Sequence, residues 1–282
     1  MTPKKVLIVY KKSTYEIYFL EHRHPLFREF RASHELHHKT LKAVQLFLKQ
    51  KGVRYRVVYR AKKMNYAPYD LVITVGGDGT FLEAARRAQK QPIFGINSDP
   101  AHSVGSFCAA GPRTFKKVLG RLLEGKAPIV RLHRIALRLN GRPVGPSALN
   151  EVLVCHRNPA AMSRYRIKLG RVREEHRDSG LWVATAAGST GAILSAGGRK
   201  LPRISARLQY RPRELYWGHG ARYRLRGGYF SSPVCLEVAS LMRDGAVYMD
   251  GPHVKIPFRF GDIVKISRSP SPLFVVRSGR AR

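Results

Sequence analysis

The segment from Leu71 to Thr80 has the sequence LVITVGGDGT, a continuous apolar run that ends in a glycine-rich turn. The run from Leu71 to Val75 is typical of a strand buried on both faces of a parallel sheet. Phe81 to Lys90 has the pattern of a helix, so the turn joins a strand to a helix. A turn of this kind presents backbone N–H groups at a helix N-terminus, where phosphate is attracted.

The elements around this segment alternate between strand and helix patterns. Strands are expected at 6–10, 55–59 and 92–96, and helices at 34–51 and 114–124. This alternation predicts a doubly wound α/β domain over residues 1–128.

From residue 129 onward the apolar runs become short, β-rich and punctuated by glycine and proline. They lie at 135–139, 151–155, 165–169, 181–184, 233–238 and 246–249. This pattern predicts a second, mainly antiparallel β domain over residues 129–282, so the fold class is α/β plus all-β. One more apolar run, Leu273 to Arg277, either closes this domain or packs back on the first one.

Composition limits the class of protein but does not select a function. The chain has 282 residues, 44% of them hydrophobic, and it lacks the roughly 20-residue apolar run of a membrane-spanning helix. The N-terminus lacks a signal-peptide pattern, so a cytoplasmic location is expected. The formal net charge is +34, which favours polyanions such as nucleotides, polyphosphate, nucleic acid or an anionic membrane. Because the basic residues are distributed along the chain, the charge does not choose among these partners.

Cysteine and histidine do not form a metal pattern in the sequence. The three cysteines, Cys108, Cys155 and Cys235, lie far apart, and buried apolar roles are expected for them. Five histidines lie between residues 22 and 38, and His34 and His38 are spaced to share one helix face. Since no cysteine or carboxylate spacing completes a site, structural or surface roles are predicted, and the metal ligands of the chain remain unknown.

Asp78, within the turn, has two possible roles. A carboxylate repels phosphate, so it fits either a metal-organising group or a base near a hydroxyl that attacks phosphorus. Alternatively, Asp78 caps the helix that begins near Phe81, and the pentapeptide alone does not decide between these interpretations. The sequence contains neither GxxxxGK[ST] nor a GxGxxG after a strand, which argues against a P-loop and an ordinary dinucleotide fingerprint.

The turn resembles the superfamily of NAD kinases, diacylglycerol and sphingosine kinases and 6-phosphofructokinases. Further segments, in the right order, resemble the NAD kinase branch in the form of the plant NADH kinase and mitochondrial NAD kinase subgroup. They are KKSTYE at 11–16, GINSDP at 95–100, NEVLV at 150–154, GLWVATAAGSTGA at 180–192, SAGG at 195–198 and DG at 250–251. The likeness therefore extends over most of the chain.

The resemblance implies an NAD(H) kinase that transfers the γ-phosphoryl of ATP to the adenosine ribose. It implies that Asp78 is the base for the ribose 2′-hydroxyl. The implied substrate-binding residues are Gly77, Gly79, Thr80, Asn97, Asn150, Glu151, Arg177, Ser179, Thr190, Gly191, Ala192 and Ser195. It also implies Mg²⁺ or another divalent cation and a homo-oligomer, at least a dimer.

The chain departs from the commoner family pattern at two substrate positions. Ser179 replaces an Asp before Gly180, and Ala192 replaces a Tyr. Asp178 is one position away, and neighbours on a strand face opposite ways, so it is not an automatic substitute. Since the plant subgroup has similar features, we expect NADH to be accepted as well as NAD.

Other interpretations remain open at this level. Linear polyphosphate is an alternative donor, because a basic surface concentrates it. A lipid kinase would carry GGDGT without the later motifs, and a basic nucleic-acid-binding protein would explain the charge but not the motifs. No specific nucleic-acid or membrane partner is expected, although a catalytically inactive relative would carry the same sequence features.

Overall fold

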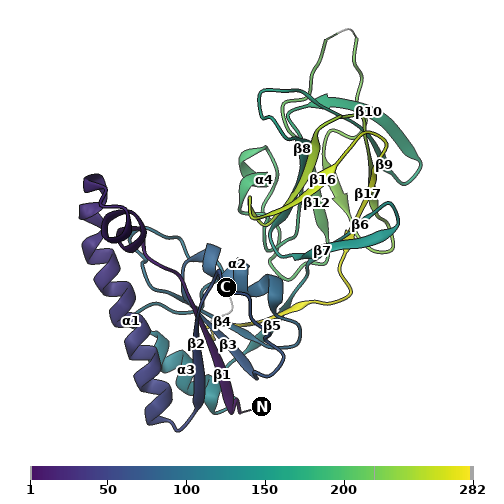
Figure 1. Ribbon diagram of the computed structural model, residues 1–282. Helices are drawn as coiled ribbons and strands as arrows, with labels where there is room; N and C mark the ends of the chain where they lie inside the picture. The colour runs from purple at the N-terminus through teal and green to yellow at the C-terminus, as the bar shows by residue number, and fades with distance from the viewer. Residues whose placement is uncertain (1, 219, 280–282) are drawn as a thin grey trace. The chain divides into compact units, whose positions relative to one another are not determined.

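The computed structural model describes residues 2–218 and 220–279 (Figure 1). The chain divides into two compact units. The first, here called the α/β unit, comprises Met1–Arg131 together with Leu273–Arg282, and the second, the β unit, comprises Leu132–Pro272. None of the helices in the described residues is both long and apolar enough to cross a membrane.

The α/β unit is built on a six-stranded sheet with the order β2-β1-β3-β4-β18-β5. These strands are β1 (Lys5–Tyr10), β2 (Arg54–Tyr59), β3 (Leu71–Gly76), β4 (Ile93–Asn97), β5 (Ile129–Leu132) and β18 (Leu273–Val276). Strands β1 to β4 are parallel to their neighbours, and β18 is parallel to β4. The run after residue 272 therefore adds a strand to the sheet of the first unit.

Three α-helices connect these strands: α1 (Arg31–Gln50), α2 (Asp78–Arg87) and α3 (Phe115–Leu123). A short π-helix, η1 (Tyr15–Glu21), and a 3₁₀ helix, η2 (Pro25–Phe30), precede α1. One apolar core joins Val44 and Leu48 of α1 to Ile73 of β3 and to Leu119 of α3. Every residue of β3 is buried, which explains why its sequence is apolar except for Thr74.

The strand order places the glycine-rich turn at a position suited to ligand binding. From β1 the chain passes to β2 on one side, and it then crosses to β3 on the other side of β1. The carboxyl ends of β1 and β3 therefore border a topological switch point, outside which open α/β sheets bind ligands. The turn at Gly76 to Asp78 follows β3 directly at this point.

The β unit contains two six-stranded sheets with antiparallel pairing. The first has the order β10-β9-β14-β17-β6-β7, formed by β6 (Ile135–Leu139), β7 (Arg142–Ala148), β9 (Ser163–Leu169), β10 (Val172–Asp178), β14 (Leu236–Ser240) and β17 (Ile263–Arg268). The second has the order β13-β12-β11-β8-β15-β16, formed by β8 (Glu151–His156), β11 (Leu181–Ala184), β12 (Leu208–Pro212), β13 (Gly228–Phe230), β15 (Gly245–Met249) and β16 (Val254–Phe258). One apolar cluster draws residues from both sheets, including Tyr165 and Val154, so the sheets enclose a common core.

This architecture confirms the predicted fold class, an N-terminal α/β part followed by an antiparallel β part. Local details differ from the sequence prediction, and the strands β5, β7, β12, β13, β16 and β17 lie outside the expected runs. Helix α2 begins at Asp78 rather than near Phe81. Strand β10 was not expected, because its sequence VREEHRD is charged, yet it pairs with β9 over its whole length. Edge strands with one solvated face carry such residues without losing backbone pairing.

Candidate functional site

The turn after β3 depends on its first glycine. Gly76 has φ +157°, and a Cβ there would lie 2.3 Å from Thr80 Oγ1. Gly77 is the N-cap residue of α2, and its carbonyl accepts the backbone N–H of Thr80 at 3.0 Å. Together these contacts turn the chain tightly from the sheet into the first turn of the helix, as expected for a glycine-rich turn.

The carboxylate of Asp78 is held by a neighbouring loop and does not cap its own helix. Its Oδ2 accepts the N–H of Ser106 at 2.9 Å, and its Oδ1 accepts the N–H of Phe107 at 2.8 Å. The start of α2 has no side-chain cap hydrogen bond, so the capping interpretation of Asp78 is wrong. Asp78 is half-buried, and each oxygen keeps a lone pair free for another partner.

Asn97, at the end of β4, shapes the loop that reaches Asp78. Its Nδ2 donates to the carbonyl of Ser103 at 2.8 Å, and its Oδ1 accepts the N–H of Asp99 at 3.1 Å. The loop is anchored further by stacking of Phe107 on Phe81 of α2, with ring centroids 5.2 Å apart. The side chain of Asn97 thereby helps to position the two N–H groups that hold the Asp78 carboxylate.

Two basic residues that the sequence analysis did not single out lie at the same edge of the sheet. Lys11 follows β1, and Arg60 follows β2. The Arg60 guanidinium lies so near Gly79 that a Cβ on that glycine would be 3.5 Å from its Nη1. Burial is the main cause that lowers the pKa of Lys11; Asp99 opposes the shift and Arg60 adds to it. The glycine-rich turn is thus bordered by positive charge suited to phosphate.

The thiol of Cys108 lies behind the turn and is not activated. Its Sγ approaches the Gly76 carbonyl at 3.8 Å. Burial, with a smaller contribution from Asp78, raises the pKa of this thiol to about 12. A neutral thiol is a poor nucleophile, so the predicted packing role of Cys108 agrees with its environment.

In the β unit, Asn150 and Glu151 are fixed through their backbone by a buried carboxylate. Asp250 accepts N–H groups from Leu149 at 2.8 Å, from Asn150 at 2.7 Å and from Glu151 at 3.3 Å. The side chain of Glu151 is also buried. Burial, followed by the negative charge of Asp250, raises the pKa of Glu151 to about 7.

The long signature packs against this same corner. Thr185 donates through its hydroxyl to the carbonyl of Leu149 at 2.6 Å and through its N–H to that of Asn150 at 2.9 Å. A Cβ on Gly188 would lie 2.2 Å from the carbonyl oxygen of Asn150, so only glycine allows this approach. A Cβ on Gly191 would lie 3.3 Å from Glu151 Oε2. The structure therefore brings the predicted residues Asn150, Glu151 and Gly191 together.

Two hollows lie in the β unit and share Trp182, Arg213 and Glu214 as walls. The first has a volume of about 500 Å³, and its lining includes Glu151 and Ser179. The second has a volume of about 580 Å³ and is lined also by the short helix α4 (Ala192–Ser195) and by Ala196. Four predicted substrate residues, Glu151, Ser179, Ala192 and Ser195, thus border these two hollows.

The side chain of Trp182 is half-exposed and lines both hollows. It pairs across the sheet with Leu153 of β8 and with Arg211 of β12, and Leu153 pairs in turn with Tyr248 of β15. The four residues form a cross-strand row on one face of the sheet, here called the Trp182 row. An indole and a phenol ring on such a row offer flat apolar surface for a nucleobase or nicotinamide.

The remaining predicted residues of this unit lie nearer to solvent. Thr190 and Arg177 are exposed, and Arg177 borders neither of the two hollows described above. Asp178 is buried and accepts hydrogen bonds from the Tyr165 hydroxyl and from the N–H of Gly180, the latter at 2.7 Å. Asp178 therefore has a structural role, in agreement with its placement on the face opposite to Ser179.

Residues 12–127 match the family model of the ATP-NAD kinase N-terminal domain. The chain is 36% identical over 264 residues to a probable NADH kinase of Oryza sativa subsp. japonica, covering 86% of this chain and 81% of the relative. It is 34% identical over 266 residues to an NADH kinase of Arabidopsis thaliana, covering 86% and 83%. An NAD kinase of Methanospirillum hungatei is 32% identical over 216 residues, covering 76% of each chain.

Solved structures show the same fold. The chain superposes on an NAD kinase from Archaeoglobus fulgidus in complex with ATP with a TM-score of 0.74, at 24% identity and covering 98% of this chain and 94% of that one. It superposes on yeast NADH kinase complexed with NADH with a TM-score of 0.71, at 16% identity and covering 98% and 84%.

Proposed function

Because the chain belongs to the NAD kinase family, we propose that it transfers the γ-phosphoryl group of ATP to the 2′-hydroxyl of the adenosine ribose of NAD or NADH. The products are ADP and NADP or NADPH. The observation that carries this assignment is the placement of Asp78, whose carboxylate is fixed by two backbone N–H groups at the switch point of the sheet.

In the proposed reaction, Asp78 accepts the proton of the ribose 2′-hydroxyl through a lone pair that the loop does not use. The ribose oxygen forms a bond to the γ-phosphorus, and the bond from that phosphorus to the β–γ bridging oxygen breaks, so ADP leaves with that electron pair. The guanidinium of Arg60 and the ammonium of Lys11 offset the negative charge of the phosphates. Gly77, Gly79 and Thr80 supply the tight backbone around them, and Asn97 positions the loop.

A divalent cation, Mg²⁺ in the first instance, is expected to enter with ATP, whose phosphates supply most of its ligands. Asp78 is the carboxylate that fits it at this edge, because its oxygens are hard donors with lone pairs to spare. The carboxylate of Asp99 also has one hydrogen-bond partner on each oxygen, the side chains of Ser33 and His102. When bound, the cation neutralises charge on the donor phosphates.

The β unit is proposed to hold the dinucleotide. Asn150 and Glu151 are suited to amino and hydroxyl groups, since one offers an amide and the other a carboxyl group. Further contacts are assigned to Arg177, Ser179, Thr190, Gly191, Ala192 and Ser195. The raised pKa of Glu151 lets it donate as well as accept a hydrogen bond near neutral pH.

The decisive assay combines the purified protein with NAD or NADH, ATP and Mg²⁺ and measures NADP(H). The variant Asp78→Asn is expected to lower kcat by about 10²- to 10⁴-fold, the range for loss of a general base. Its circular dichroism and melting curve check that the fold survives. Wild-type protein without activity, or Asp78→Asn with undiminished kcat, would contradict the proposal.

The same assay also identifies the phosphoryl donor. ATP is the proposed donor, and replacing it with linear polyphosphate tests the alternative; NADP(H) formed with ATP alone rejects polyphosphate.

We also propose a homo-oligomer, at least a dimer, on the basis of family membership. Light scattering on the purified protein tests this, and a monomeric mass at assay concentration would contradict it.

A further inference from the structure

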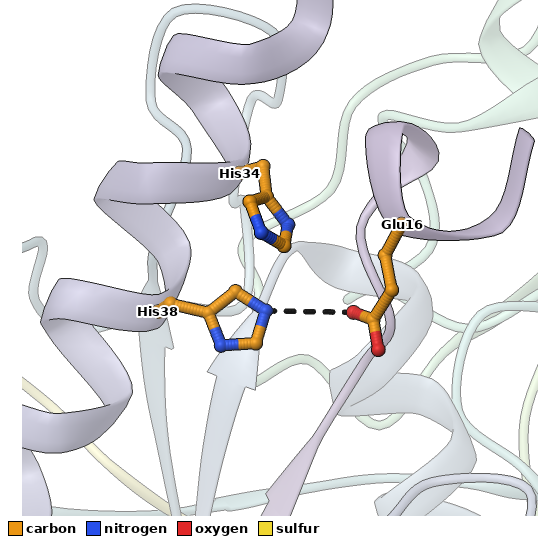
Figure 2. A group of neighbouring side chains, drawn as sticks. All are labelled: Glu16, His34 and His38. Carbon is orange, nitrogen blue, oxygen red and sulfur yellow. Dashed lines mark ion pairs between the residues drawn. The ribbon is translucent and has the colours of Figure 1, made fainter. Parts of the chain in front are cut away.

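Three side chains of the α/β unit that have no part in the proposed reaction converge on one point (Figure 2). His34 and His38 lie one helical turn apart on α1, and Glu16 faces them from η1. One potential ligand atom from each residue lies within 4.8 Å of the other two. The histidine spacing was visible in the sequence, but the carboxylate belongs to a separate segment that only the fold brings near.

The distances suit a small cation. His38 Nε2 lies 3.4 Å from Glu16 Oε2. Two ligands held ~2.1 Å from a tetrahedral zinc ion are themselves about 3.4 Å apart. The same His38 Nε2 is shielded from water, yet it makes no hydrogen bond within the residues that the structure describes. A buried nitrogen lone pair beside a carboxylate, without a hydrogen bond, is the arrangement that a metal ion would satisfy.

The imidazole of His34 is already oriented by a second contact. Its Nδ1 lies 2.8 Å from the hydroxyl of the buried Ser13, and that hydroxyl also accepts the N–H of Glu16 at 3.0 Å. When Nδ1 carries the hydrogen, the lone pair is on Nε2. Metal-binding histidines are commonly fixed in this way through their other nitrogen.

The neighbouring His37 does not belong to the cluster of Glu16, His34 and His38. Its Nδ1 lies 2.8 Å from Ser98 Oγ, and its Nε2 lies 2.8 Å from the carbonyl of Lys11. Both nitrogens are therefore engaged, and His37 is directed toward the end of β4 and not toward Glu16. The three histidines of α1 thus comprise one buried structural histidine and two candidate ligands.

We propose that Glu16, His34 and His38 form a binding site for a divalent transition metal of the zinc class, separate from the cation that accompanies ATP. Two imidazoles and one carboxylate are a ligand set that zinc accepts, with the remaining position open to water. The metal ties η1 to α1. Because α1 also contacts the end of β4 through Ser33 and His37, the metal stabilises the helix that supports residues 98–99.

The test uses the full chain, stripped with a chelator and kept in excess Mg²⁺ without nucleotide. Zinc is titrated in competition with a chromogenic chelator, and one zinc per chain is expected. His38→Asn and Glu16→Gln are expected to weaken zinc binding roughly tenfold or more. The matched controls His253→Asn and Glu29→Gln, both at exposed positions, are expected to bind like the wild type.

Two further measurements distinguish loss of the metal site from misfolding of the variants. Zinc is expected to raise the melting temperature of the wild type and of the controls, and to leave that of His38→Asn and Glu16→Gln unchanged. X-ray absorption of the zinc-loaded wild type needs no variant, and it is expected to show scattering from two imidazoles. Equal zinc affinity in all variants, no zinc retained by the wild type, or a ligand shell without two imidazoles would each overturn the proposal.

Discussion

The carboxylate of Asp250 holds the backbone N–H of Asn150 at 2.7 Å, in the loop that leads into β8. The same carboxylate lies near the buried side chain of Glu151 and helps to raise its pKa. One acidic residue therefore fixes the backbone of the proposed dinucleotide site and adds to the effect of burial in raising the pKa of Glu151.

This relationship predicts a pH dependence of stability. The pKa of Glu151 is about 7 in the folded chain, whereas the ordinary value for a glutamate is 4.5, so the folded state retains a proton that the unfolded state releases. The free energy of unfolding should therefore fall as pH rises from about 4.5 to 7, by up to roughly 3 kcal/mol at about 1.36 kcal/mol per pH unit. Urea denaturation of wild type and Glu151→Gln across this range measures the slope. The same slope in the variant would show that another group causes it.

Arg60 is expected to contribute to binding of the phosphoryl donor, since its guanidinium lies beside Gly79. Arg60→Ala should lower kcat/KM for ATP roughly tenfold or more, the loss expected for one charge-assisted contact. Lys63→Ala removes a positive charge from an exposed position nearby in sequence and serves as the control. Equal losses in the two variants would point to general electrostatics instead of a contact by Arg60.

The Trp182 row is expected to bind the dinucleotide by stacking. Trp182→Ala should raise the KM for NAD(H), because base–aromatic stacking contributes ~1–3 kcal/mol. Trp217→Ala is the matched control, as its side chain is 56% exposed and borders neither hollow. Steady-state kinetics at saturating ATP distinguishes the variants. A wild-type KM for NAD(H) in Trp182→Ala would contradict a role of the Trp182 row in binding the dinucleotide.

Ser179 is expected to influence the choice between the oxidised and reduced dinucleotide. The nicotinamide ring of NAD carries a positive charge that NADH lacks, so a carboxylate in the first hollow should favour NAD. Wild type should use NADH at least as well as NAD, and Ser179→Asp should shift the ratio of kcat/KM values several-fold toward NAD. Ser231→Asp, at an exposed position, is the control. A strong wild-type preference for NAD would reject the expectation.

The parts of the fold that depend on residues adjacent in the sequence could be predicted from the sequence. The apolar run of β3 and the turn that follows are contiguous, so burial and backbone freedom are both visible in LVITVGGDGT. The family assignment from ordered motifs is confirmed by the relatives. Strand β10 escaped prediction because its partners, and not its own hydrophobicity, hold it in the sheet.

The sequence analysis missed other residues for a different reason. Lys11 and Arg60 become neighbours because β1 and β2 pair in parallel with Tyr10 opposite Tyr59, and Arg60 also lies beside Gly79. Trp182 joins Tyr248 through the registers of β8, β11 and β15. Which residues become neighbours in this way depends on the order and register of the strands, and neither can be derived from a single sequence. Glu16 reaches the two histidines of α1 for the same kind of reason.

Strand β18 lies between β4 and β5 in the sheet of the α/β unit, although the whole β unit separates it from both in the chain. During synthesis, residues 132–272 leave the ribosome before this strand does. The β unit is contiguous and can complete its core first, while the α/β unit has a missing strand in its sheet until Leu273–Val276 emerge. The β unit can therefore complete its core before the α/β unit does, although most of the α/β unit is translated first, and β5 has no neighbour in the sheet until Leu273–Val276 have been made.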